Sequence, residues 1–305
     1  MDAAAEVGCG VRRGAALLLA AAACARAATF YVTVTGLGGE PDYEQRFAGW
    51  GREIDKTLRD AGGDARVVTL TAPTREKVRA AMAAVAREAK PEDALVLMLI
   101  GHGTWDGTEY KFNLPGPDLS SAELAGLLDR VKAARQLVVN MTSASGGSME
   151  GLRKPNRIVV CATRSGTEKN ATVFARYWVE ALRDPAVDTD KNETVSALEA
   201  FRYAQRKTAA FYETEKRLAT EHAVLEDGGK GDGPLASVFP VLRLGRTAAA
   251  ARDPAKLKLL AAKEDLEQRI DRLKYQKAAI PPDEYKKQLA ALLIELARTQ
   301  EALEK

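Results

Sequence analysis

The chain has 305 residues, of which 46% are hydrophobic and 29% are charged, so it is long enough for one large domain and an appendage. The 45 lysines and arginines nearly balance 42 acidic residues, and the formal net charge is only +3. A charge this small gives no reason to expect a nucleic acid or a membrane surface as a partner.

Residues 1–27 have the features of a secretory signal peptide. An arginine pair precedes the apolar stretch Gly14–Ala23, which is too short to span a bilayer, and Ala25-Arg26-Ala27 offers a small-x-small cleavage site. We therefore expect an exported protein, periplasmic or secreted, with no transmembrane segment in the mature chain. The residues before Cys24 form a poor lipobox, so a lipoprotein is the weaker alternative.

Removal of residues 1–27 takes away Cys9 and Cys24 and leaves Cys161 as the one cysteine. One cysteine cannot form an internal disulfide, so the core has to stabilise the fold even in an oxidising compartment.

The rest of the first 245 residues alternates apolar strands with amphipathic helices. This alternation predicts an α/β fold with a mostly parallel sheet that is covered by helices on both faces. A loop with Trp105 and Tyr110 is expected to carry a short hairpin. In chain order, the predicted strands are Thr29–Thr35, Ala65–Leu70, Ala94–Ile100, Gln136–Asn140 and Asn156–Cys161, and the predicted helices are Tyr43–Ala61, Arg75–Lys90, Ser121–Ala134, Ala171–Arg183 and Ser196–Glu221.

Two of these strands break into glycine and small polar residues. Ala94–Ile100 is followed by Gly101-His102-Gly103, and Gln136–Asn140 is followed by a turn with the sequence Thr142-Ser143-Ala144-Ser145-Gly146. The carboxyl ends of parallel strands share one edge of the sheet, where open α/β folds place their chemistry. We therefore expect His102 and Ser143 to lie near one another.

This arrangement resembles the legumain/caspase-like cysteine peptidases, in which a His-Gly after one strand and an Ala-Cys-x-Ser-Gly turn after the next form the catalytic dyad. The resemblance covers about residues 29–245. It implies a caspase-like sandwich, with His102 as the histidine and the backbone N–H of Gly103 in the oxyanion hole. Ser143 then stands at the nucleophile position, where the family has cysteine.

A serine hydroxyl is far less acidic than a cysteine thiol, so its attack requires a base and usually a third group that orients the histidine. Asp106 is the acid nearest to His102 in the sequence. We therefore favour a degenerate peptidase, a pseudoenzyme that binds a peptide or protein in its cleft as a scaffold in the cell envelope. The alternative is an active endopeptidase that uses Ser143 with His102, or Cys161.

Residues 188–199 resemble an EF-hand calcium loop. The loop departs from the motif at Glu193, where a glycine is expected because the backbone adopts a conformation that is costly for other residues. The alternative is a polar inter-helix loop whose acids serve as helix caps. The expected calcium ligands are Asp188, Asp190, Asn192, Thr194 through its carbonyl, and Glu199 as a bidentate carboxylate.

The last part of the chain predicts a separate element. Residues 246–254 are expected to be a linker after the domain of residues 28–245. Residues 255–305 have near-heptad leucines that are interrupted at Pro281-Pro282, which predicts an antiparallel α-helical hairpin or coiled coil. It is either a solvated appendage or a surface for a protein partner or self-association.

Overall fold

A computed structural model describes residues 27–63, 65–228 and 233–305 of the chain. The predicted signal peptide therefore lies outside the described residues, apart from Ala27. Within the described ranges, none of the helices combines the length and apolarity that are needed to cross a membrane.

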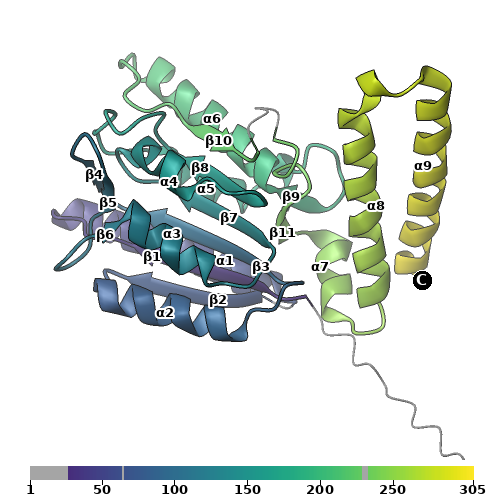
Figure 1. Cartoon of the computed structure of the whole chain (residues 1–305), viewed down its shortest axis with the longest axis horizontal. Coiled ribbons are helices and arrows are strands. Elements are labelled where there is room, and N and C mark those ends of the chain that lie inside the picture. The colour runs from purple at the N-terminus through teal and green to yellow at the C-terminus, as the bar shows by residue number, and fades with distance from the viewer. Residues whose placement is uncertain (1–26, 64, 229–232) are drawn as a thin grey trace, which may run out of the picture.

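The centre of the molecule is a six-stranded sheet with the order β10-β8-β7-β3-β1-β2 (Figure 1). Neighbouring strands are parallel except β10, which pairs antiparallel with β8 at one edge. The predicted mostly parallel α/β fold is confirmed. The strands are β1 (Thr29–Thr35), β2 (Ala65–Thr71), β3 (Ala94–Ile100), β7 (Arg135–Asn140), β8 (Arg157–Cys161) and β10 (Val224–Glu226).

Alternate residues of each buried strand point to opposite sides of the sheet, so both of its faces are apolar. Helices cover both faces. One apolar cluster joins the sheet to α1 (Pro41–Ala61), α5 (Phe174–Ala181) and α6 (Ala197–Thr214). The other cluster joins the sheet to α2 (Arg75–Glu88), α3 (Ser121–Asp129) and the short α4 (Met149–Leu152).

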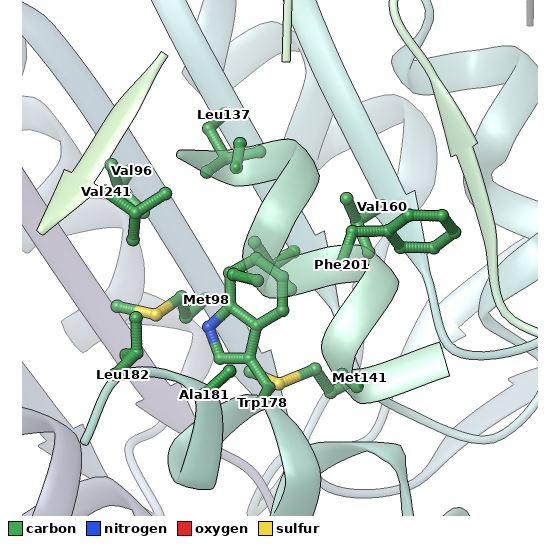
Figure 2. Close-up of a cluster of buried hydrophobic side chains, with 14 of the residues drawn as sticks. Val96, Met98, Leu137, Met141, Val160, Trp178, Ala181, Leu182, Phe201 and Val241 are labelled. Atoms are coloured by element: carbon green, nitrogen blue, oxygen red, sulfur yellow. The ribbon is translucent and has the colours of Figure 1, made fainter. Parts of the chain in front are cut away.

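Trp178 of α5 is the largest fully buried side chain of the molecule's described part. Figure 2 shows its indole among Met98, Leu137 and Val160 of the sheet and Phe201 of α6. Truncation of an aromatic side chain this deeply buried typically costs about 3–5 kcal/mol of stability. This cluster therefore holds α5 and α6 on the sheet and fixes the loops at its edge.

Two small antiparallel sheets accompany the central one. The first consists of β4 (Gly103–Trp105), β5 (Tyr110–Phe112) and β6 (Leu119–Ser120), which confirms the expected hairpin. The second pairs β9 (Thr194–Ser196) with β11 (Pro240–Arg243).

The carboxyl-terminal hairpin is confirmed as α8 (Leu257–Tyr275) and α9 (Pro282–Glu304), with α8 between the domain and α9 in Figure 1. The predicted linker, residues 246–254, is largely helical instead. It contains most of α7 (Gly245–Arg252), which buries Thr247, Ala250 and Ala251. The chain thus passes from the domain to the hairpin through a packed helix and not through an extended segment.

Candidate functional site

His102 lies where the strand order of the sheet reverses. The chain runs outward from β1 to β2 and then returns across β1 to β3, so the carboxyl ends of β1 and β3 border a topological switch point. The Gly36 N–H after β1 donates to the Ile100 carbonyl at the end of β3, 2.7 Å away. His102 follows Ile100 by two residues, so it lies at the edge of the sheet where the sequence predicts it.

The imidazole of His102 packs against two aromatic rings of α1. Its centroid lies 4.8 Å from that of Tyr43 and 5.2 Å from that of Phe47, both in edge-on geometry. Burial lowers the pKa of His102, while a hydrogen bond with the Gly38 backbone and the charge of Glu40 act in the opposite direction. The lowered pKa favours the uncharged form of the ring.

Ser143 follows β7, the neighbour of β3, and its side chain is only 2% exposed. Its hydroxyl accepts a hydrogen bond from the Gly103 N–H and donates one to the Gly103 carbonyl, each 3.1 Å long. In the described part of the chain, no hydrogen bond joins this hydroxyl to the His102 ring. The Gly103 N–H, which the family resemblance assigns to the oxyanion hole, is therefore already hydrogen-bonded to the Ser143 hydroxyl.

Two glycines of the expected dyad motif, Gly103 and Gly146, are required by close packing. A Cβ on Gly103 would lie 2.6 Å from the Ser143 carbonyl oxygen, and a Cβ on Gly146 would lie 2.3 Å from the backbone nitrogen of Ser165. Neither position has room for a side chain. Ala144, in the turn after β7, has a φ of +55°, which is costly for a residue other than glycine, and its N–H donates to the Glu168 carbonyl.

A buried polar network beneath Ser143 holds its turn. The Tyr110 hydroxyl lies 2.6 Å from Thr142 Oγ1, which donates to Asn140 Oδ1 at 2.8 Å. The Asn140 amide in turn donates to Ser148 Oγ at 3.0 Å. The sequence alone does not predict this network, because only the fold brings the β5 tyrosine onto the β7 turn.

The two other residues considered for catalysis serve the fold. Cys161 is fully buried in the second apolar cluster, and burial raises the pKa of its thiol to about 12. Asp106 accepts the N–H groups of Thr108 and Glu109, so it caps the β4–β5 turn and does not orient His102.

Trp105 is the aromatic residue at the border of this site. It is half-buried at the end of β4, and its indole packs against Gly147 after β7 and Gly166 after β8. Nearby, the exposed Arg164 lies 3.9 Å from the Glu168 carboxylate, which also lies 2.6 Å from His222 Nδ1. An indole surface and a basic side chain thus border the turn that carries Ser143.

The predicted calcium loop brings three carboxylates together. Oxygens of Asp188, Asp190 and Glu199 all lie within 4.8 Å of one another. The Asp188 carboxylate accepts the N–H groups of Asn192 and Glu193 at 3.1 and 3.0 Å. Glu193 has a φ of +63°, so the loop adopts the turn expected of a glycine at this position.

The other expected ligands of the loop have different surroundings. The Asn192 Oδ1 atom is buried and has no hydrogen-bond partner within the described structure. Glu199 accepts the Thr189 N–H through one oxygen and caps α6 through Ser196 with the other, while Thr194 lies in β9. Burial, reinforced by the Glu199 charge, raises the pKa of Asp190 to about 6. The acids therefore serve as caps and also converge as a ligand set would.

Comparisons by sequence give no match for this chain. No protein-family model matches it. No curated protein matches it either.

Three solved structures are similar to this structure at low sequence identity. The Drosophila initiator caspase Dronc is 9% identical with a TM-score of 0.45, over 74% of this chain and 92% of the other. Caspase-1 from Spodoptera frugiperda is 11% identical with a TM-score of 0.48, over 66% and 87%. The protein GSU0716 from Geobacter sulfurreducens is 13% identical with a TM-score of 0.47, over 72% and 100%.

Proposed function

We propose that this chain is a caspase-like pseudopeptidase, a binding module that has kept the peptidase arrangement without its chemistry. The proposal depends chiefly on the Ser143 hydroxyl, which makes reciprocal hydrogen bonds with the backbone of Gly103 and none with His102 among the described residues. A serine nucleophile needs a base within hydrogen-bond reach to remove its proton. In this structure the His102 ring contacts the aromatic rings of Tyr43 and Phe47, and the Ser143 hydroxyl makes its hydrogen bonds with Gly103.

The second candidate is an active endopeptidase that uses Ser143 and His102. It is favoured by one observation, namely that the two residues follow neighbouring strands and that Ser143 contacts the residue next to His102. Catalysis would require the hydroxyl to leave Gly103 and turn toward the imidazole. A role for Cys161 is disfavoured, since a thiol with a pKa of about 12 contains almost no thiolate at neutral pH.

The proposed ligand is an extended segment of a peptide or protein. The half-buried indole of Trp105 and the exposed guanidinium of Arg164 support this choice, because both residue types are enriched among the anchors of protein interfaces. The surface is built on loops after β3, β7 and β8, which the rigid sheet holds in place.

A peptide array incubated with the folded protein tests this function. We expect retention of a subset of peptides, with binding weakened about tenfold or more in Trp105→Ala, a typical loss for an interface anchor. Trp50→Ala is the matched control, because Trp50 lies on α1 and its ring contacts Phe47 of the same helix, with no contact to the Ser143 turn among the described residues. Equal retention by the two variants, or no retention by the wild type, would contradict the proposal.

We also propose that the protein acts in the cell envelope, as a periplasmic or secreted protein. The support is the signal-peptide pattern of residues 1–27, with cleavage after Ala27. Lipidation of Cys24 remains the weaker alternative.

We further propose that residues 188–199 bind calcium as a structural ion. The residues present suit it, since Ca²⁺ takes oxygen ligands from carboxylates, amides and backbone carbonyls. Asp188, Asp190 and Glu199 would supply charge, and Asn192 would supply its unpartnered buried amide oxygen. Bound calcium would neutralise crowded carboxylates and tie the η2 turn (Pro185–Val187) to α6.

A further inference from the structure

Among the described residues, Ala28 is the first whose backbone N–H and carbonyl are both hydrogen-bonded to the rest of the fold. Its N–H donates to Asp93 Oδ1 at 2.7 Å, and its carbonyl accepts the Ala94 N–H at 2.9 Å. The methyl group of Ala28 packs against the second apolar cluster. Ala27, by contrast, is exposed. Within the described residues, the change from an exposed residue to a hydrogen-bonded one thus falls at the peptide bond between Ala27 and Ala28.

The carboxylate that receives the Ala28 N–H is buried, and it lacks a cationic partner among the residues that the structure describes. Asp93 is 3% exposed, and its second oxygen accepts the Lys90 backbone N–H at 2.8 Å. No lysine, arginine or histidine of the described ranges lies within ion-pair distance of it. Such a carboxylate is unusual, because acidic residues are rarely buried to this extent without a positive charge beside them.

We propose that signal cleavage supplies this charge, and that Asp93 is the receptor site for the new amino terminus. Hydrolysis of the Ala27–Ala28 bond adds water, so that the carboxylate departs with Ala27 and the amine stays on Ala28. At neutral pH this amine binds a proton, and the nitrogen that already lies 2.7 Å from Asp93 becomes an ammonium. The inference rests on the export that is part of the proposed function.

The consequence is that processing stabilises the mature fold. In the precursor, Asp93 has two neutral N–H donors, whereas in the mature chain it has a charge-assisted hydrogen bond, which is about twice as strong. Cleavage elsewhere in residues 20–30 would not place the ammonium on this oxygen. The fold should therefore be most stable with Ala28 as its amino terminus.

A double-mutant cycle tests the pairing. Two chains are produced by a tag protease that leaves Ala28 or Ala27 as the first residue, each with the wild-type sequence or with Asp93→Asn. Both starts carry one terminal ammonium, so they differ in its position and not in net charge. We expect the Ala28 start to melt about 2–4 °C above the Ala27 start, and Asp93→Asn to remove this difference.

An Ala28 start that melts no higher than the Ala27 start would overturn the proposal, and this comparison needs no substitution at Asp93. A difference in melting temperature between the two starts that persisted in Asp93→Asn would also overturn the proposal. Expression of the full chain in an exporting bacterium, with intact mass as the readout, separates the two levels of the argument. Ala28 as the mature terminus is the expected result, another cleavage site contradicts this inference alone, and an uncleaved cytoplasmic chain contradicts the export as well.

Discussion

At the residue scale, the same atoms explain both why the site looks like a peptidase and why it is not expected to act as one. Gly103 and Gly146 match the family pattern, and each is also required by a backbone that passes within 2.6 Å of its missing Cβ. Ser143 fills the space beside Gly103 and satisfies both of its backbone groups. A serine at this position can therefore be retained for its contribution to the turn, without any contribution to catalysis.

The buried thiol of Cys161 gives a pH-dependent prediction. Its pKa of about 12 lies above the value of an unfolded thiol, about 8.5, so the native state keeps a proton that the unfolded chain loses between these values. Stability should therefore fall as the pH rises through this window, by about 2 kcal/mol at pH 10. Urea unfolding at pH 7 and pH 10 measures the loss.

Cys161→Ala is the control for this prediction, since the variant should show a smaller loss between the two pH values. Buried Tyr31 and Tyr110 have raised pKa values as well. The variant leaves the contribution of Tyr31 unchanged, and at Tyr110 it removes the Cys161 charge, which is a smaller cause of the raised pKa than burial. The native wild-type thiol should also resist alkylation at pH 8 and react fully in denaturant. Rapid labelling of the native protein would mean that Cys161 is accessible, and it would reopen the cysteine-peptidase alternative.

At the element scale, the calcium loop can be tested through the helix that it precedes. Millimolar calcium should raise the melting temperature of the wild type, because an ion selective for the folded state stabilises it by mass action. Glu199→Gln should abolish the rise while it preserves the capping box, since glutamine can also fill this position.

Glu213→Gln is the matched control, because Glu213 is exposed on the same helix and lies outside the loop. It should keep the calcium response of the wild type. A wild-type melting temperature that does not change with calcium would leave the acids of the loop with their capping roles alone.

The strands were predictable because each buried strand is a short apolar run that ends in glycine or small polar residues. Helix ends were less predictable. The expected helix Ser196–Glu221 ends as α6 at Thr214, and the chain turns so that the Glu221 carboxylate caps α5 at Val173 and Phe174. The edge strand β10 that follows was missed, since its three residues become a strand only by pairing with β8.

For the candidate site, the positions of the residues were predictable from the sequence and their side-chain partners were not. Adjacent strand ends placed His102 and Ser143 on one edge, as the sequence predicts. The side-chain partners were not predictable, because Tyr43, Phe47 and Tyr110 come from elements whose approach depends on the packed core. Local sequence contains no signal for such contacts.

At the scale of the whole molecule, the hairpin is attached mainly by polar contacts. The Arg243 guanidinium pairs with Glu264 of α8 at 2.8 Å, and the Lys263 ammonium donates to the Asn192 carbonyl at 2.9 Å. Neither apolar cluster of the described structure includes a residue after Leu244. A cavity of about 470 Å³ lies between α8 and the sheet, at the strand ends opposite His102. The domain core is therefore complete without the hairpin.

Two truncations test this boundary. Deletion of residues 254–305 should leave a soluble, folded domain with a lower melting temperature, because the partly buried ion pair between Arg243 and Glu264 is lost when α8 is removed. Deletion of residues 281–305 alone should give a less soluble protein, because it uncovers Ile270 and Leu273, which face Leu296 and Leu292 of α9.

Light scattering and circular dichroism of the two truncated proteins measure the outcome. An insoluble product from the longer deletion would show that the hairpin belongs to the core of the domain. Association through the hairpin stays a prediction, for which the exposed Leu293 and Ile294 of α9 are the starting point.

The most direct test of the account is a peptide-library digest by the wild-type protein, with Ser143→Ala and His102→Ala as controls. A catalytic dyad would make the two controls inactive and leave the wild type active. We expect that the wild type cleaves no peptide faster than Ser143→Ala does, because the Ser143 hydroxyl is hydrogen-bonded to Gly103 and the imidazole packs against Tyr43 and Phe47. Hydrolysis by the wild type that disappears in both variants would contradict it.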